Sequence, residues 1–364
     1  MSSIYGKNIK VSIFGQSHSK AIGVVIDGIP AGEALDIDKL KAFTARRAPS
    51  SHSLGTKRRE ADEFEILSGI NNDKFCGAPF AATITNTNAH PGDYSEFSEK
   101  PRPGHADYTA GIKYGEATDF SGGGHFSGRL TAPLCIAGGI CAQLLEKRGI
   151  FVASHHERIG KARDKRFDPV SVSKSDFDAL FTDGFTAIDK KALADMKEVV
   201  SLCAKEGDSV GGVIECAVTG LPVGVGEPMF DGLENKIAAA VFAIPGVKGI
   251  EFGSGFECAA LFGSENNDEF TYSENKVVTR TNNHGGILGG LSSGMPLIFR
   301  VAMKPTPSIF KEQNTVNLTD KNDCKLQIKG RHDPCIALRA LACVESVAAI
   351  AVYDLLLDYY KSNH

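Results

Sequence analysis

The sequence predicts one α+β domain with internal pseudo-twofold symmetry, and three observations support this. Short β-branched runs alternate with segments of helical periodicity. A strand–turn–helix pattern occurs twice. No linker or break in composition divides the 364 residues. We therefore treat residues 1–364 as a single domain.

Alternating or continuous apolar runs predict six strands, and apolar spacings of three and four predict five helices. The strands are expected at residues 11–14, 23–27, 64–67, 81–85, 211–215 and 296–303. The helices are expected at residues 37–47, 129–147, 174–181, 189–207 and 334–359. The last helix is long and mostly apolar, so we expect it to be deeply buried.

The repeated pattern joins two distant segments. GVVIDGIPAGE at residues 23–33 resembles GGVIECAVTGLPVGVGE at residues 211–227. Each contains a strand and a G-[IL]-P-x-G turn, and each precedes an apparent helix. Duplication would give two related halves, whereas the alternative is coincidence between two glycine-rich turns.

Composition limits the class of protein. The net charge is −4, which disfavours a general nucleic-acid binder; that alternative rests only on basic pairs such as Arg46–Arg47 and Arg58–Arg59. The chain shows no signal-peptide core and no run of about 18 apolar residues, so we expect a cytoplasmic protein without a membrane partner. Nine cysteines without a CxxC pair fit a reducing compartment. Without HExxH or CxxC, we expect no metal site.

Two polar motifs contain candidate proton donors. GQSHS follows the strand at 11–14 and places His18, a residue that titrates near neutrality, at the strand's end. The alternative is a nucleophilic pair of Ser17 and His18. Adjacent residues on a strand point to opposite faces, however, so the two side chains are poorly placed to bond each other. In RPGHADYT at residues 102–109, the proline–glycine pair fixes a turn that presents Arg102 and His105. Asp107 is placed to orient the imidazole or to cap a turn.

Further motifs suit an anionic ligand. In DFSGGGHFSGRLTAPL at residues 119–134, three glycines lead towards a helix, and Ser127 and Arg129 add polar donors. KPTPS at 304–308 presents Lys304 on a proline-stiffened segment, and NNHGGILGG at 282–290 allows close backbone approach. In GRHDPCIALRA, Asp333 has the sequence of a helix N-cap, which would place Arg331 at a positive helix end.

Together these motifs closely resemble the chorismate synthase family over essentially the whole chain. The order and spacing of the motifs carry the resemblance. They are FGQSHS, RRAPS with TKRRE, RPGHADYT, GDSVGGVIE, VKGIEFGSGF, NNHGGILGGLSSG, MKPTPSI and GRHDPC.

The resemblance implies a carbon–oxygen lyase of the shikimate pathway, which leads to the aromatic amino acids. Such an enzyme converts 5-enolpyruvylshikimate 3-phosphate to chorismate and phosphate by a 1,4-anti elimination. It implies a large β-α-β sandwich with internal pseudo-twofold symmetry, a cytoplasmic homotetramer, and a requirement for reduced FMN without net redox change. NADPH is a candidate reductant of the flavin.

The resemblance also implies residue roles. His18 would protonate the departing phosphate, His105 would lie by the flavin, and Asp333 would help to relay the C6 proton through flavin N5. Ser17 and Ser127 would position these groups. Arg46, Arg47, Arg102, Arg129 and Arg331 would face the anionic substrate, and Arg46 is also the candidate NADP contact. Flavin contacts would come from His125, Phe126, Ser127, Pro245, Gly246, Gly289, Lys304, Pro305, Thr306, Pro307, Ser308 and Arg331.

Some positions differ from the usual family pattern. His125 and Phe126 stand where arginine and serine are common, and Gln16 stands where glutamate is common. These differences motivate an alternative: a flavin- or phosphate-binding member of the family with impaired or lost catalysis.

Overall fold

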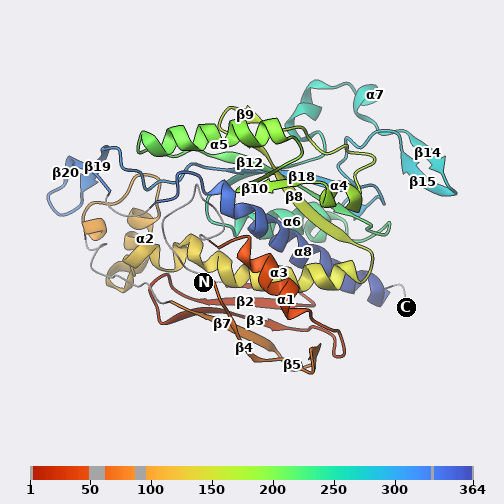
Figure 1. Cartoon of the computed structure of the whole chain (residues 1–364), viewed down its shortest axis with the longest axis horizontal. Helices are drawn as coiled ribbons and strands as arrows, with labels where there is room; N and C mark the ends of the chain where they lie inside the picture. Colours follow the sequence, from red (N-terminus) through yellow and green to blue (C-terminus); the bar gives the residue numbers. More distant parts are fainter. Residues whose placement is uncertain (1–2, 49–61, 87–95, 329–331, 363–364) are drawn as a thin grey trace.

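Two five-stranded antiparallel sheets enclose a layer of helices in the computed structural model, which describes residues 3–48, 62–86, 96–328 and 332–362 (Figure 1). The first sheet has the strand order β1-β2-β3-β7-β4 and the second β13-β18-β12-β8-β9. The first contains β1 (Ile4–Tyr5), β2 (Lys10–Gly15), β3 (Ala21–Asp27), β4 (Glu65–Ser68) and β7 (Phe80–Thr85). The second contains β8 (Phe151–Ile159), β9 (Ala162–Arg163), β12 (Gly212–Thr219), β13 (Val247–Phe252) and β18 (Leu297–Met303).

Four strands of each sheet correspond in sheet order and in chain order, which confirms the predicted pseudosymmetry. Strands β2, β3, β7 and β4 match β8, β12, β18 and β13, so the two halves of the sequence repeat occupy the central strands β3 and β12. Gly28 and Gly220 end these strands with φ of 92° and 84°. A Cβ at either position would lie 2.1 Å from a backbone carbonyl oxygen, that of Asn8 or of Gly149. Both turns therefore require glycine.

Helices α3 (Thr131–Glu146) and α8 (Ala337–Ser362) pack against each other between the sheets, flanked by α1 (Ile37–Ala45) and α6 (Leu233–Phe242). They approach closely because Gly138 has no side chain: a Cβ there would lie 2.1 Å from the Cβ of Ser346. Gly128–Glu146, which contains α3, and α8 have the length and composition of membrane spans. However, 78% of the α3 window and 94% of the α8 window are buried within the protein.

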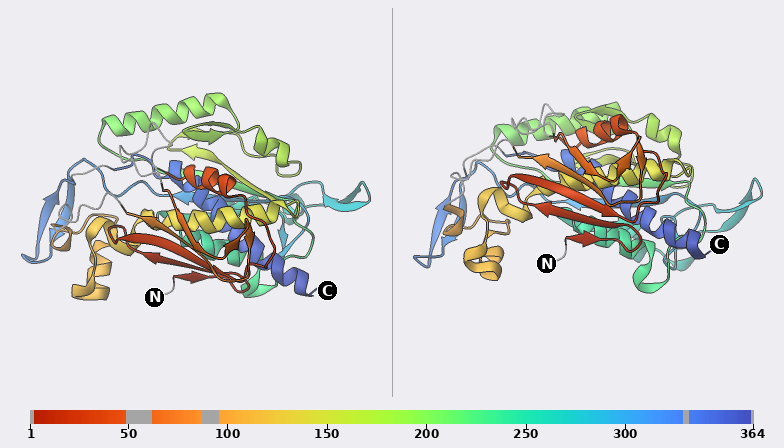
Figure 2. Two further views of the ribbon diagram at one scale, coloured as in Figure 1. Left: turned by 60° about the horizontal axis from the view of Figure 1, so that its bottom comes forward. Right: turned by 90° about the horizontal axis from the view of Figure 1, so that it is seen from below.

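The outer face of the second sheet is covered by α5 (Lys190–Lys205), as Figure 1 shows. Two hairpins project at opposite ends of the molecule (Figure 2): β14 (Phe270–Ser273) with β15 (Lys276–Thr279), and β19 (Gln313–Asn317) with β20 (Asn322–Leu326). The remaining short pairs are β5 (Ile70–Asn71) with β6 (Lys74–Phe75), β10 (Phe181–Asp183) with β11 (Phe185–Ala187), and β16 (Ile287–Leu288) with β17 (Leu291–Ser292). The short helices are α2 (Asp107–Tyr114), α4 (Lys174–Asp178) and α7 (Gly263–Asn266).

Two predicted helices have the wrong boundaries. The helix expected over 174–181 ends at Asp178, because Phe181 begins a strand paired with β11. The last helix begins at Ala337 and not at Pro334. Asp333 is therefore no N-cap; its carboxylate pairs with Arg339 instead, at 2.9 Å.

Candidate active site

The glycine turn at residues 122–124 brings His18 and His105 to one place. His18 follows β2, and its Nδ1 lies 3.1 Å from the carbonyl oxygen of Ser121. A Cβ at Gly122 would lie 2.2 Å from Cε1 of His18, and one at Gly123 would lie 3.2 Å from Nε2 of His105. Both glycines have positive φ, 60° and 89°. The turn thus gives the two imidazoles adjacent backbone surfaces.

His105 is oriented by Asp107, as the sequence suggested. Its Nδ1 lies 2.7 Å from Oδ1 of Asp107 and 3.1 Å from Nη2 of Arg102. Arg102 binds the same carboxylate through Nε and Nη2, both at 2.7 Å, and its guanidinium stacks over Phe97 at 4.3 Å. Burial raises the pKa of Asp107, but the hydrogen bonds from Arg102 and His105 outweigh it and hold that pKa well below its usual range. Arg102 is thereby committed to an internal carboxylate.

A buried carboxylate, Asp62, joins two of the predicted arginines. Oδ2 of Asp62 accepts from Nη1 of Arg47 at 2.5 Å, and Oδ1 pairs with Nη1 of Arg129. Arg47 also donates to Oγ1 of Thr131 and to the carbonyl of Gly128, at 3.0 and 2.9 Å. Burial raises the pKa of Asp62, yet the positive charges of Arg47 and Arg129 produce a net lowering. Asp62 therefore holds both guanidinium groups in fixed positions.

Arg339 extends this cluster to Asp333. Its Nε donates to the carbonyl of Arg47 at 3.1 Å, and its Nη1 bonds Oδ2 of Asp333 at 2.9 Å. The carbonyl of Asp333 accepts from Oγ1 of Thr306 at 2.7 Å, which ties the cluster to the 304–308 segment. Burial and the neighbouring charge of Arg47 lower the pKa of Arg339.

Asn86 connects the arginine cluster to the His18 loop. Its Oδ1 accepts from Nε of Arg129 at 3.2 Å, while its Nδ2 donates to the carbonyls of Gln16 and Ser19 at 3.2 and 2.8 Å. The amide of Ser17 donates to the carbonyl of Gly124 at 3.0 Å. Loops that are far apart in sequence are therefore bonded directly to one another.

Lys304 contacts the loop that contains His105. Its Nζ donates to the carbonyl of Gly104, and its amide donates to the carbonyl of Gly246 at 2.9 Å. A Cβ at Gly104 would lie 3.4 Å from Cβ of Pro307. Burial and the charge of Lys248 lower the pKa of Lys304, so a nearby anion would be favourable.

The groups expected to hold a flavin fit a flat aromatic ligand with a phosphate. The rings of His125, Phe126 and Tyr114 pack together beside the glycine turn, with centroid separations of 4.3 to 6.3 Å. Nε2 of His125 is buried without a hydrogen-bond partner among the described residues. Lys304, Thr306 and Ser308 supply the polar groups that a phosphate requires.

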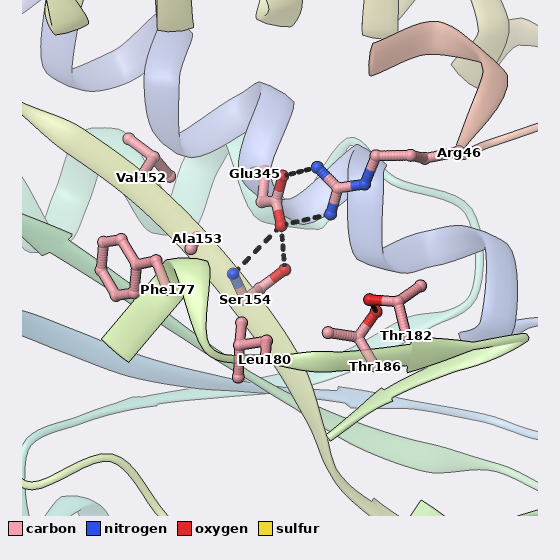
Figure 3. Close-up of a pocket in the computed structure, with 9 residues that line it drawn as sticks. All are labelled: Arg46, Val152, Ala153, Ser154, Phe177, Leu180, Thr182, Thr186 and Glu345. Atoms are coloured by element: carbon pink, nitrogen blue, oxygen red, sulfur yellow. Dashed lines mark hydrogen bonds and ion pairs between the residues drawn. The ribbon is translucent and has the colours of Figure 1, made fainter. Parts of the chain in front are cut away.

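The structure does not unite every predicted residue. Arg46 turns away from Arg47 and forms a bidentate pair with Glu345, at 2.6 and 2.7 Å (Figure 3). That pair borders a separate cavity of about 190 Å³. The hairpin containing Gly289 packs at the start of β18, whereas Lys304 follows its end. Arg331 lies outside the described residues.

The expected anion site at a helix N-terminus is not formed as predicted. Helix α3 begins at Thr131, seven residues after Gly124. The side chains of Thr131 and Arg129 at that end are bonded to Arg47 and Asp62. The glycines serve instead to admit the two histidines. In the described ranges, no group of three or more histidine, cysteine or acidic residues is arranged to hold a metal ion.

Three residues that join these loops were not predicted: Asp62, Asn86 and Arg339. Asp62 and Asn86 stand in no motif that suggests chemistry by itself. Arg339 lies in an apolar segment near the start of α8, and that placement was the available signal, because a partly buried arginine requires a partner.

These loops define a class of protein: a β-α-β sandwich whose joined ends form a polar site with two imidazoles and several guanidinium groups. The family model for chorismate synthase matches residues 9–357, and the chain belongs to the chorismate synthase family.

Curated relatives and a solved structure agree with this assignment. Chorismate synthases of Dehalococcoides mccartyi strain 195 and Thermococcus kodakarensis are each 44% identical to the chain. The alignments cover 98% and 97% of this chain and 97% of each relative. A crystal structure of chorismate synthase superposes with a TM-score of 0.75 at 25% identity, covering 98% of this chain and 93% of the other. The predicted fold and family are confirmed.

Proposed function

We propose that this chain catalyses the 1,4-anti elimination of phosphate from 5-enolpyruvylshikimate 3-phosphate, giving chorismate. One observation carries the assignment: adjacent glycines seat His18 and His105 on one turn, beside Lys304 and the buried arginine cluster. The substrate carries a phosphate and two carboxylates, which guanidinium and ammonium groups recognise by charge-assisted hydrogen bonds.

His18 is the proposed acid for the leaving phosphate. Its Nδ1 faces the carbonyl of Ser121, an acceptor, which favours a proton on that nitrogen. In the imidazolium form Nε2 also carries a proton, which it can give to a phosphate oxygen. Ser17, packed on the same glycine turn, is proposed to position the loop.

His105 and Asp333 are the proposed groups on the cofactor side. Asp107 fixes the His105 imidazole through Nδ1, leaving Nε2 beside Gly123 to exchange a proton or stabilise charge. Asp333 is the proposed acceptor for the C6 proton, and Arg339 holds its carboxylate in place. Ser127 would help to position this side of the site.

The proposed cofactor is reduced FMN. Residues 125–127, Gly246 with the preceding Pro245, and Lys304 to Ser308 are the groups that would hold it. When bound, it would lend electron density to the substrate transiently and recover it with the products. Gly289 and Arg331 stay predictions for this site. We also propose a cytoplasmic homotetramer, by analogy with the family.

Arg47 and Arg129 are the proposed substrate contacts among the arginines, with Arg102 acting through His105. Arg46, in its separate cavity, is proposed to lie outside the substrate site; NADPH contact is the role left to it.

The test is anaerobic turnover with chemically reduced FMN and the enolpyruvyl substrate, with phosphate and chorismate quantified. His18→Ala and His105→Ala should each lower kcat by about 100-fold or more, as expected for general acid–base groups. Lys325→Ala, an exposed change on β20, is the control. Flavin binding without chorismate in the wild type would instead favour the catalytically impaired alternative. A parallel assay with NADPH and oxidised FMN tests self-reduction.

A further inference from the structure

Asp268, His284 and Ser293 form a hydrogen-bonded relay outside the site described above. Nδ1 of His284 bonds Oδ2 of Asp268, and Nε2 of His284 lies 2.9 Å from Oγ of Ser293. The relay lies at the start of β18, where the amide of Ile298 donates to the carbonyl of Gly285 at 3.1 Å. Lys304 follows the other end of this seven-residue strand, about 20 Å away at 3.4 Å per residue.

The surroundings of Asp268 select one histidine tautomer. Its carboxylate also accepts from Oγ1 of Thr281 and from the amides of Asn283 and His284, at 2.6, 2.8 and 2.9 Å. Burial raises the pKa of Asp268, but these donors outweigh it and lower that pKa, so the carboxylate is ionised and only accepts. Nδ1 of His284 must then carry the proton. In the neutral ring Nε2 is a base, and the hydroxyl of Ser293 donates to it.

Ser293 also has the local features of a nucleophile. Its side chain is only half-buried, and the next residue, Gly294, is exposed. In the described part of the chain, the amide of Gly294 donates no hydrogen bond, so it can stabilise an oxyanion at the neighbouring residue. Val223 lies directly beside Gly294 and exposes 63% of its surface, which offers an apolar contact for a small acyl group.

The preceding serine does not share these features. Ser292 is the central serine of a G-x-S-x-G match at residues 290–294, but it is buried. Its hydroxyl donates to the carbonyl of Pro222 at 2.6 Å and accepts from the amide of Val225 at 2.8 Å. The geometry therefore singles out Ser293.

We propose that Ser293, His284 and Asp268 form a second catalytic site that hydrolyses small, unhindered carboxylic esters. Oγ of Ser293 adds to the ester carbonyl while its proton passes to Nε2 of His284. The carbon–oxygen bond to the alcohol breaks, and the alcohol leaves with that proton. Water then adds to the acyl carbon and gives one proton to Nε2 of His284. The bond between the acyl carbon and Oγ breaks, that proton restores the serine hydroxyl, and the carboxylic acid leaves. This activity is independent of the proposed lyase reaction.

The test uses the full-length protein with p-nitrophenyl acetate as substrate and a fluorophosphonate as covalent probe. We expect one phosphonyl group per chain, on the peptide containing Ser293. Ser293→Ala should abolish labelling and lower the enzyme-dependent ester rate about 100-fold. Ser254→Ala is the matched control, since the Ser254 hydroxyl donates to the carbonyl of Asn283 at 3.2 Å on the same loop system and, among the described residues, bonds no member of the relay.

Chorismate formation reports on folding in each variant, because none of these residues belongs to the site at the glycine turn. Asp268→Asn should lower the ester rate while chorismate formation persists; if that variant fails to fold, labelling of the wild type still decides. Absence of label at Ser293 in the folded wild type would overturn the proposal. An ester rate unchanged in Ser293→Ala would also overturn it. The relay would then have only a structural role, as hydrogen bonds that stabilise the loop.

Discussion

Gly122 stands directly against the imidazole of His18, with a hypothetical Cβ only 2.2 Å from the ring carbon Cε1. The same Cβ would lie 2.8 Å from Oγ of Ser17. Because the φ of Gly122 is also positive, at 60°, this position excludes side chains both by space and by backbone conformation. The absence of a side chain at Gly122 therefore leaves the space that the imidazole of His18, the proposed acid, occupies.

Gly122→Ala should therefore reduce turnover without destroying the fold. We expect a fall in kcat of about 100-fold, because a displacement of the proton donor by about 1 Å is enough for that loss. Gly128→Ala is the matched control: its Cβ would meet nothing within 4 Å, and its φ is not positive. Anaerobic turnover and thermal melts of both variants make the comparison. Equal activity of the two alanine variants would show that Gly122 is not needed to position His18.

Asp107→Asn should affect both stability and His105. The change leaves the buried guanidinium of Arg102 without its carboxylate, which costs about 3–5 kcal/mol of the free energy of unfolding. It also weakens the acceptor that orients His105, so kcat should fall further than the loss of folded protein explains. Denaturant unfolding and turnover, corrected for the folded fraction, separate the two effects.

The acid limb of stability provides a further check on Asp107. A carboxyl whose pKa is lowered on folding adds stability above its unfolded pKa, about 3.9, and that stability is lost as pH falls towards the folded pKa. Wild-type stability should thus drop more steeply below about pH 4 than that of Asp107→Asn. If the free energies of unfolding of the two proteins fell in parallel below pH 4, Asp107 would not be the source of this acid sensitivity.

The arginine cluster shows how far sequence reasoning reached. His18, His105, Arg47, Arg129 and Lys304 were predicted from motifs and the family resemblance, and the structure joins their loops. The motifs did not reveal that Arg46 and Arg47, adjacent in sequence, pair with different carboxylates, Glu345 and Asp62. That outcome depends on where α1 ends relative to α8, a tertiary relationship that local spacing does not encode.

The pseudosymmetric fold was easier to predict than these pairings. Strand periodicity and the two G-[IL]-P-x-G turns reflect local backbone requirements, and both turns occupy equivalent places at the ends of β3 and β12. Partners such as Asp62 and Asn86 join segments tens of residues apart through single polar side chains. A lone aspartate or asparagine carries no periodic signal, so these partners became visible only in three dimensions.

Arg339, which no motif identified, should be required for turnover. Arg339→Lys preserves charge but cannot bond both the carbonyl of Arg47 and the carboxylate of Asp333 in the same fork geometry. We expect kcat to fall about 10- to 100-fold. Arg280→Lys is the control, since Arg280 directly follows β15 and its side chain is 68% exposed. Wild-type kcat in Arg339→Lys would remove the positioning role.

A buried histidine in the second sheet should make stability depend on pH in the opposite direction. His155 lies between Asp164 and Glu215, at 3.1 and 2.9 Å, and Glu215 also contacts Arg300. Burial lowers the pKa of His155, but the two carboxylates outweigh it and raise that pKa. Its stabilising contribution is therefore complete below the unfolded pKa, about 6.5, and is lost as pH rises through the folded value.

Wild-type Tm should accordingly decrease above about pH 6.5 more steeply than the Tm of His155→Gln. Glutamine keeps a donor for one carboxylate but cannot titrate. Thermal melts of both proteins at matched ionic strength provide the comparison. A constant difference in Tm across this range would show that His155 does not titrate in the folded protein.

Arg46 and Arg47 offer a pairwise test of whether the substrate binds at the Asp62 cluster or in the cavity beside Glu345. Arg47→Leu removes a guanidinium from the cluster with Asp62 and Arg129, so turnover with pre-reduced FMN should fall about 100-fold or more. Arg46→Leu leaves that cluster intact, and kcat/KM should stay within about threefold of the wild type. Its effect should be on stability, because Glu345 is 3% exposed and would lose its cation.

Adding Glu345→Gln to Arg46→Leu tests that explanation directly. The double variant should recover part of the lost Tm, because the uncompensated buried charge is gone. The side-chain oxygen of the glutamine can still accept from the backbone amide and the hydroxyl of Ser154, which lie 3.0 and 2.8 Å from the Glu345 carboxylate in the wild type. Turnover measured on the same preparations should stay near wild type throughout. If Arg46→Leu lost as much activity as Arg47→Leu, the substrate site would have to include the cavity beside Glu345.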